Sequence, residues 1–312
     1  MRCMVIDIGS NTVKYDVFSL DGGALSPVAR RSRTVRLIDR IKDGKLKKDG
    51  RKKLCETLEK YTKDAKELDC ARVEAFATAS LRRLNDPQKT IDKIEKETGL
   101  KVRLLSGEEE AACAFRGMLL TALPLPRHGV MLDMGGGSTE ITVFKDGVKV
   151  FSHSMPFGAL SLKTAFGAGP FLSKERFEEI SAHAASFVPE EARTLFPGQL
   201  AAVPTGGTAK AILKLTNLLL PGRANGCEIP PDVFEELTGF FMKEDPAAAE
   251  LVKAAVPERY DLMAAGLAGY AGVFASLGVK DVIVCKGGIR EGYLPYIDGR
   301  DDLVYKETEA ER

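Results

Sequence analysis

Two carboxylates flank the only Gly-Gly-Gly run of the chain, in the segment VMLDMGGGSTEITVF at residues 130–144. Asp133 precedes this turn and Glu140 follows it. The turn itself consists of Gly135, Gly136, Gly137 and Ser138. Glycines in a turn accept positive φ angles and let backbone N–H groups approach an anion that a Cβ atom would keep away. The alternating residues after the turn predict a β-hairpin whose tip is a phosphate cradle.

The same pattern occurs a second time near the N-terminus. Residues 5–18, VIDIGSNTVKYDVF, align with residues 131–144, MLDMGGGSTEITVF, when each residue is paired with the one 126 positions later. This alignment pairs Asp7 with Asp133 and Gly9 with Gly135. A single glycine turn is more often only a turn, but two copies in register favour two facing cradles that bind a nucleotide or a polyphosphate. The first cradle consists of Asp7, Gly9, Ser10, Asn11 and Thr12.

A third glycine loop is predicted in the second half of the chain. The segment LAAVPTGGTAKAIL at residues 200–213 is typical of a strand, a Gly-Gly turn and a helix that begins near Thr208. Helix N-termini with glycine-rich entries bind anions through unpaired N–H groups and the helix dipole. Gly206, Gly207 and Thr208 are therefore candidate phosphate ligands.

The segment SGEEEAACAFRGMLL predicts a helix start that carries three glutamates. Ser106 is the expected N-cap and Glu109 completes a capping box, while all three glutamates complement the helix dipole. Glu110 is the one left for chemistry, and the small residues after it allow another backbone to approach closely. A carboxylate at a helix start between phosphate cradles is a candidate general base.

Basic side chains are concentrated in residues 30–53, where 12 Lys or Arg stand against 3 Asp, a local charge of +9. Most of these charges are expected on a solvated face, and the alternative is an electrostatic track for a long polyanion.

After a predicted buried strand, Arg82 or Arg83 either binds phosphate oxygens with its guanidinium fork or caps a helix. The pattern alone favours neither role.

The composition indicates a chain of 312 residues, 44% hydrophobic, that can form two domains of ordinary size. A net charge of +1 gives no global field that favours nucleic acid or a membrane surface, and no apolar run has the length of a membrane span. The six cysteines form no C-x-x-C pair, which argues against a zinc site or a disulfide framework and favours a reducing, cytoplasmic location. Predicted strands alternate with helices in both halves, so the expected class is α/β.

Six separated motifs carry a resemblance to a known family: DIGSN, ATASLR, SGEEEA, LDMGGGSTE, PTGGT and GGIREG. In their order and approximate spacing, the chain resembles the exopolyphosphatase/guanosine pentaphosphate phosphohydrolase (Ppx/GppA) family over nearly its whole length. The resemblance implies an α/β fold with two ribonuclease-H-like domains of the actin-like ATPase and sugar kinase superfamily, with the two cradles facing each other across an interdomain cleft. The expected domains are residues 1–120 and 121–312.

The resemblance also implies a reaction, the hydrolysis of the terminal phosphoanhydride of inorganic polyphosphate or of guanosine pentaphosphate (pppGpp). Glu110 matches the glutamate that activates water, and Arg82 is placed with it as a catalytic residue that contacts phosphate. Asp133 and Glu140 match the pair that organises Mg²⁺, directly or through water, with Mn²⁺ as the alternative metal. Neither nucleic acid nor a membrane is an expected partner, and a homodimer is left open.

Other chemistries have less support. The chain contains no D-x-D-x-[TV] aspartyl nucleophile and no C-x5-R cysteine loop. The alternative function is a regulator that binds guanosine tetraphosphate, pppGpp or polyphosphate without turnover, although retention of all three acids opposes it. A kinase or ATPase of the same superfamily is disfavoured because the acid of SGEEEA resembles the phosphatases specifically.

The chain departs from the resembled family in the segment RLIDRIKDG, where Ile38 and Arg40 stand in place of two glycines of a turn near the cleft. Asn85 also follows ATASLR one residue early. These departures leave the choice between polyphosphate and pppGpp open. Long family members append a helical unit that is not expected here, which favours shorter polyphosphates. The final residues, DDLVYKETEAER, are expected to form a frayed polar tail.

Overall fold

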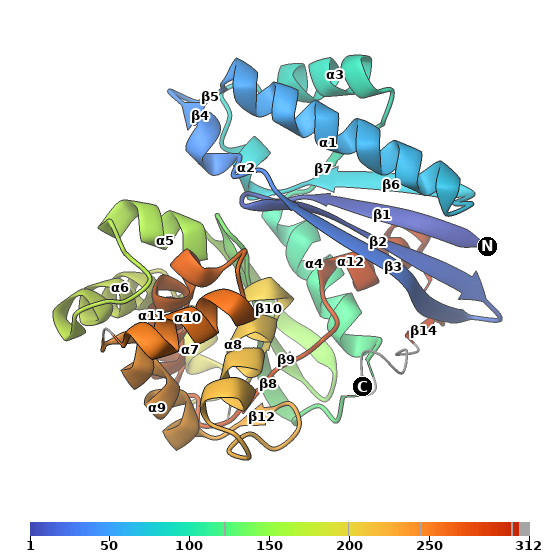
Figure 1. The fold of residues 1–312 in the computed structure, drawn as a ribbon. Coiled ribbons are helices and arrows are strands. Elements are labelled where there is room, and N and C mark those ends of the chain that lie inside the picture. Colours follow the sequence, from blue (N-terminus) through green and yellow to red (C-terminus); the bar gives the residue numbers. More distant parts are fainter. Residues whose placement is uncertain (122, 199, 244, 301, 306–312) are drawn as a thin grey trace. The chain divides into compact units, whose positions relative to one another are not determined.

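The computed structural model describes residues 1–121, 123–198, 200–243, 245–300 and 302–305. The chain divides into two compact units, drawn in Figure 1: unit 1 is Met1–Ala122 with Ile289–Arg312, and unit 2 is Leu123–Gly288. The first boundary lies close to the predicted one, but the C-terminal segment joins unit 1, whereas the prediction assigned it to the second domain. The physical reason is that helix α12 (Ile289–Asp298) packs on α4 (Gly107–Leu119) and β1 (Arg2–Ile8) of unit 1.

Unit 1 is built on a six-stranded sheet with the order β14-β3-β2-β1-β6-β7. The first three strands of the chain are antiparallel in succession, whereas β6 and β7 run parallel to β1. The other strands are β2 (Thr12–Asp21), β3 (Ala24–Thr34), β6 (Arg72–Ala77), β7 (Arg103–Leu104) and β14 (Val304–Tyr305). Because β14 pairs with β3, the expected frayed tail is wrong for these two residues, and the residues after Tyr305 lie outside the described part.

Helices cover both faces of this sheet, which explains why β1 is buried on both sides. Figure 1 shows α1 (Lys48–Glu67) and α3 (Pro87–Thr98) over one face, and their core includes Leu58 and Ile94. On the other face, α4 and α12 cover Phe76, whose ring centroid lies 4.6 Å from that of Tyr293. The short elements are η1 (Ile38–Arg40), β4 (Ile41–Lys42), β5 (Lys45–Leu46) and α2 (Ala79–Arg82).

Unit 2 repeats this plan with the strand order β10-β9-β8-β11-β13-β12. β8, β9 and β10 are antiparallel in succession, and β11 and β13 run parallel to β8. The strands are β8 (His128–Met134), β9 (Thr139–Lys145), β10 (Val148–Met155), β11 (Ala201–Thr205), β12 (Glu228–Ile229) and β13 (Val282–Ile283). The helices are α5 (Ala159–Phe166), α6 (Lys174–Ser186), α7 (Glu190–Thr194), α8 (Gly206–Leu219), α9 (Pro231–Phe241), α10 (Pro246–Ala255), η2 (Tyr260–Leu262) and α11 (Met263–Leu277).

The predicted internal duplication is present in the fold. β1 runs from Arg2 to Ile8 and β8 from His128 to Met134, so both ends of the two strands keep the spacing of 126 residues. Both units are ribonuclease-H-like α/β sheets, because an antiparallel three-stranded meander is followed by parallel strands in the same order. In each unit the parallel strands end at one edge of the sheet, which is where open α/β sheets bind ligands.

The six cysteines all lie within the described residues and form no disulfide. The described helices include none that is both long enough and apolar enough to cross a bilayer.

Candidate functional site

The predicted site residues are divided between the carboxyl edges of the two sheets. Unit 1 holds the first cradle and the predicted catalytic pair: Asp7, Gly9, Ser10, Asn11, Thr12, Arg82 and Glu110. Unit 2 holds the second cradle, the two predicted metal ligands and the third loop: Asp133, Gly135, Gly136, Gly137, Ser138, Glu140, Gly206, Gly207 and Thr208.

The loop between β1 and β2 is closed by a hydrogen bond from the Gly9 N–H to the Thr12 carbonyl at 3.1 Å. The Asn11 carbonyl accepts two more, from the N–H groups of Val35 at 3.0 Å and Arg36 at 2.8 Å, so the segment after β3 holds this loop in place. The side-chain nitrogen and oxygen of Asn11 are buried and have no hydrogen-bond partner among the described residues. Buried polar atoms are nearly always satisfied, so this loop has the character of a ligand site.

Asp7 is mostly buried and its carboxylate lies 3.3 Å from the guanidinium of Arg290 on α12. Arg290 also lies 3.1 Å from Asp16, a buried carboxylate of β2. Burial raises the pKa of Asp7, and the charge of Arg290 opposes that shift. Sequence reasoning misses Arg290 as a site residue: the GGIREG motif contains it, but 283 positions separate it from Asp7.

Glu110 and Arg82 form an ion pair, with 2.6 Å between Nη1 of Arg82 and Oε2 of Glu110. The predicted capping box of Ser106 and Glu109 is present, and Glu110 is only 7% exposed, unlike its neighbours in this first turn. Arg82 ends α2 and also donates to the Leu105 carbonyl at 2.9 Å. Because β6 and β7 are adjacent parallel strands, the helices that follow them begin side by side. The pair therefore fixes the orientation of a carboxylate at the edge of the sheet.

The small residues after Glu110 allow the close backbone approach that the sequence predicts. The approaching element is α12, where a Cβ atom on Gly292 would collide with the Cys113 carbonyl of α4. The helix that carries Glu110 is therefore held against the C-terminal segment of the same unit.

The second cradle has the same closing bond as the first, from the Gly135 N–H to the Ser138 carbonyl at 2.9 Å. The carbonyls of Gly135 and Gly136 accept from Ala159 at 3.0 Å and Ser161 at 2.9 Å at the start of α5. The structure contains no cis peptide among its described residues, and in a trans peptide the C=O and N–H point in opposite directions. The N–H groups that follow these carbonyls therefore point away from α5, as an anion cradle requires.

Asp133 and Glu140 are directly opposite each other on β8 and β9, with 8% and 1% of their surface exposed. Like charges at opposed strand positions repel, and burial strengthens the repulsion. Ser154 donates to Oε1 of Glu140 at 2.8 Å. Mg²⁺ commonly binds through one or two carboxylates, with phosphate and water oxygens completing its shell, so this pair fits such an ion. Within the described residues, no group of three or more His, Cys, Asp or Glu is placed to hold a metal by itself.

The third loop is the junction of β11 and α8, which begins at Gly206, two residues earlier than predicted. Thr205 does not cap the helix, because its hydroxyl donates to the Gly287 carbonyl instead. Gly206 has a φ angle of +78°, and a Cβ atom there would collide with the Asp133 carboxylate. A helix N-terminus without a side-chain cap, entered through two glycines, favours an anion.

Arg259 is a second residue that sequence reasoning misses. Its guanidinium packs on Gly207, where a Cβ atom would collide with it, and its Nη1 donates to the Thr208 hydroxyl at 3.2 Å. That hydroxyl in turn donates to the Met134 carbonyl at 3.1 Å. Arg259 lies 51 positions from Thr208 in an irregular segment, so no local pattern marks it. The third loop thus combines an uncapped helix start with a fixed positive charge.

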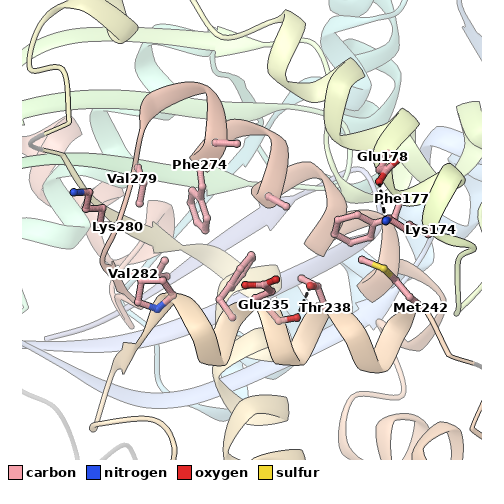
Figure 2. Close-up of a pocket in the computed structure, with 14 residues that line it drawn as sticks. Lys174, Phe177, Glu178, Glu235, Thr238, Met242, Phe274, Val279, Lys280 and Val282 are labelled. Atoms are coloured by element: carbon pink, nitrogen blue, oxygen red, sulfur yellow. Dashed lines mark hydrogen bonds and ion pairs between the residues drawn. The ribbon is translucent and has the colours of Figure 1, made fainter.

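A separate pocket of about 480 Å³ lies in unit 2 between α6, α9 and α11 (Figure 2). Its walls are mainly apolar and include Phe177, Phe274 and Val282, and Lys174 lies 3.9 Å from Glu178 at its rim. None of the predicted site residues is among its described lining residues. Its apolar character does not suit phosphoryl groups, so we assign it no part in the chemistry.

The sequence of this chain is similar to those of known phosphatases. Residues 17–297 match the Ppx/GppA phosphatase family. Exopolyphosphatase 1 of Mycobacterium bovis is 33% identical over 161 residues, which cover 51% of this chain and 47% of that protein. The guanosine-5'-triphosphate,3'-diphosphate pyrophosphatase of Aeromonas hydrophila is 25% identical over 294 residues, covering 93% of this chain and 58% of that protein. The chain spans about half the length of these curated relatives.

Two solved structures share the fold. An exopolyphosphatase from Cytophaga hutchinsonii superposes with a TM-score of 0.84 at 18% identity, over 97% of this chain and 100% of that one. A PPX-GPPA enzyme of Aquifex aeolicus gives a TM-score of 0.73 at 25% identity, over 94% of this chain and 98% of that one.

Proposed function

Because the chain belongs to the Ppx/GppA phosphatase family, we propose that it hydrolyses the terminal phosphoanhydride of inorganic polyphosphate or pppGpp. The observation that carries this proposal is the buried Glu110 carboxylate, which Arg82 holds at the same sheet edge as the Gly9–Thr12 loop. The names of the relatives, an exopolyphosphatase and a guanosine-5'-triphosphate,3'-diphosphate pyrophosphatase, support the substrate class.

In this mechanism Glu110 accepts a proton from a water molecule as the water attacks the terminal phosphorus in line with the leaving oxygen. The transition state of phosphoryl transfer is loose, so positioning and charge stabilisation contribute more than covalent chemistry. Arg82 orients the carboxylate, and a guanidinium beside it is suited to bind a phosphoryl oxygen. The backbone N–H groups of the glycine loops seat the other phosphoryl oxygens.

Mg²⁺, or Mn²⁺ in its place, would be held by Asp133 and Glu140 and would neutralise phosphoryl oxygens when bound. The support is the opposed, buried pair of carboxylates, whose mutual repulsion a divalent cation relieves. Arg259 and the N-terminus of α8 supply further positive potential in the same unit.

The decisive experiment measures phosphate release from polyphosphate and from pppGpp with Mg²⁺, beside equilibrium binding of the same ligands. Glu110→Gln is expected to lower turnover by roughly 10²–10⁴-fold, the usual contribution of a general base. Glu108→Gln removes the same charge from the same helix turn at an exposed position and serves as the control. Equal effects of the two substitutions would contradict the assignment of Glu110. Tight binding without release would favour the alternative, a regulator that binds these ligands.

A cytoplasmic location is a further part of the proposal, supported by six cysteines that form no disulfide. Nucleic acid and membranes are not proposed as partners. A substrate panel with the purified protein decides between polyphosphate and pppGpp, and sedimentation decides whether the protein is a homodimer.

A further inference from the structure

The basic run of residues 30–53 separates into two kinds of side chain in the structure. Lysines along the β4–β5 hairpin and the start of α1 are exposed: Lys42, Lys45, Lys47, Lys48 and Lys52. Five other basic residues are half-buried: Arg33, Arg36, Arg40, Arg51 and Lys53. Arg51 forms an ion pair with Glu97, which lies outside the run. Partial burial of a cation costs free energy unless an anion accompanies it, so half-buried basic side chains differ from those of an ordinary solvated face.

Three elements of unit 1 bring the other four half-buried residues together. Arg33 lies at the end of β3 and Arg36 follows it, while Arg40 ends η1. The Nε of Arg40 donates to the Val35 carbonyl at 3.1 Å, and the Arg40 side chain packs on Gly50 at the start of α1. Lys53 is on the next turn of that helix.

The charges of this group act on one another. Burial lowers the pKa of Lys53, and Arg40, Arg33 and Arg36 lower it further through their positive charges. Arg40 forms an ion pair with the exposed Asp49, whereas Arg33 and Lys53 form no ion pair within the described residues. Arg33 and Lys53 therefore keep their positive charges at a partly desolvated place.

The group adjoins the first phosphate cradle directly. Val35 and Arg36 donate their N–H groups to the Asn11 carbonyl, and Ile38 donates to the Ser10 carbonyl at 3.3 Å. Arg36 has a φ angle of +53°, which is unfavourable for a residue with a Cβ and is held here by its bond to the loop. The cradle's Asn11 has a buried side chain without partners among the described residues, an independent sign that a ligand binds at this edge.

The same segment is anchored beside the predicted catalytic arginine. Asn85 donates from its backbone to the Gly44 carbonyl at 2.8 Å and from its side chain to the Asp43 carbonyl at 3.1 Å. Asn85 follows α2, the helix that ends with Arg82. Arg40 and Asn85, two of the three departures from the family pattern, thus both contact this basic segment, Arg40 through Val35 and Asn85 through Asp43 and Gly44.

We propose that Arg33, Arg36, Arg40 and Lys53 form an additional anion subsite that binds the phosphoryl groups of a linear polyphosphate beyond those seated in the Gly9–Thr12 loop. This inference rests on the proposed function and narrows its substrate class to the inorganic polymer. Guanidinium groups bind phosphate oxygens in a bidentate fork, and a lysine adds a point charge. A polyphosphate continues as a row of anionic groups away from its end, as such a subsite requires.

Nucleic acid is a poorer fit to the same group. Proteins that bind single strands combine basic grooves with aromatic side chains on which bases stack. Residues 30–53 contain no Phe, Tyr, Trp or His. The subsite offers charge without a stacking surface, which suits a polyanion that has no bases.

The subsite predicts a specific dependence on chain length. Affinity rises from tripolyphosphate to longer chains as more phosphoryl groups reach the subsite, and then levels off once the chain spans it. Binding of the longer chains also falls more steeply with salt than binding of tripolyphosphate, because more charges take part.

The test is equilibrium binding of linear polyphosphates of increasing defined length to the full chain carrying Glu110→Gln, so that the ligand is not consumed. The double substitution Arg33→Gln and Lys53→Gln is compared with Lys48→Gln and Lys52→Gln. Both pairs remove two positive charges from the same run, but the control pair is exposed. The first pair is expected to weaken binding of the longer chains roughly tenfold and to abolish the rise with length, with a much smaller loss in the control pair. Urea unfolding checks that both variants fold.

Several outcomes would overturn the subsite: equal losses in the two pairs, a rise with length that persists in the first pair, absence of polyphosphate binding, or equal competition by an oligothymidylate of matched charge. The proposed function is judged separately, by phosphate release from the wild-type protein. Release together with equal losses would reject the subsite alone. A length-dependent difference between the pairs without release would reject the hydrolase and keep the subsite.

Discussion

At the scale of single residues, the Asp133 carboxylate packs against the third loop at Gly206, a position that has no Cβ atom. Gly206 combines a φ angle of +78° with a Cα that faces the Asp133 carboxylate, whereas Gly222 has nearly the same φ angle, +77°, and open space around it. Substituting each glycine in turn therefore distinguishes the effect of backbone strain from the effect of a collision with Asp133.

We predict that Gly206→Ala displaces the Asp133 carboxylate and lowers Mg²⁺-dependent phosphate release more than tenfold, in addition to about 1 kcal/mol of backbone strain. Gly222→Ala carries the same strain without the collision, so it is expected to lose stability but retain activity. Phosphate release and urea unfolding of both variants provide the measurement. Similar activity in the two variants would show that Asp133 is not sensitive to this contact.

The opposed carboxylates of Asp133 and Glu140 lead us to expect that metal removal changes the stability of the protein. In EDTA, Asp133→Asn is expected to be at least as stable as the wild type, because one of two buried like charges is gone. Added Mg²⁺ raises the Tm of the wild type by mass action, and this rise is lost in the variant. Asp146→Asn, at an exposed turn of the same meander, is the control and keeps the rise. A Mg²⁺ shift that survives in Asp133→Asn would contradict the metal assignment.

At the scale of elements, the first turn of α4 positions Glu110 through its capping box. Ser106 accepts the Glu109 N–H at 3.1 Å, and the Glu109 carboxylate accepts the Ser106 N–H at 2.9 Å and pairs with Arg103. Burial acts to raise the pKa of Glu109, but the bonds from Ser106 and Arg103 outweigh it and the net shift is downward. The ionised carboxylate is thus the form that stabilises this helix start.

The downward shift of the Glu109 pKa makes the stability of the folded protein depend on pH. A carboxyl whose pKa is lower in the folded than in the unfolded state adds stability above its unfolded value, near 4.5, and loses it as pH falls through the folded value. Glu109→Gln is expected to cost about 1 kcal/mol at pH 7, and the difference from the wild type shrinks as the pH is lowered below 4.5. Urea unfolding at several pH values measures it, with Glu108→Gln as the exposed control. A difference that grows toward low pH would be the opposite of this expectation.

At the scale of the whole molecule, unit 1 is assembled from both ends of the chain. Arg290 on α12 lies within ion-pair distance of Asp7 and Asp16, whose strands begin the chain. Asp16 is 1% exposed, and its ion-pair partners are Arg290 at 3.1 Å, from the C-terminal segment, and Arg30 at 3.5 Å.

Arg290→Gln is therefore expected to destabilise the protein by about 3 kcal/mol, since removing one partner leaves a buried carboxylate undercompensated. The further substitution Asp16→Asn in the same chain is expected to restore part of that loss, because the orphaned charge is removed. A double-mutant cycle by urea unfolding tests this coupling. Purely additive effects of the two substitutions would mean that the pair is not coupled.

The sequence by itself determined the duplicated hairpins, the glycine loops and the capping box, because each depends on residue types at fixed local spacings. It also placed Glu110 at a helix start, and Asp133 and Glu140 on either side of a hairpin turn. Only the tertiary structure decided which carboxylate each arginine contacts. Arg290 and Asp7 are 283 positions apart, and their contact follows from the packing of α12 on β1. For the same reason, only the folded chain separates half-buried cations from solvated ones in the basic run: burial depends on what packs around a side chain, which local composition does not record.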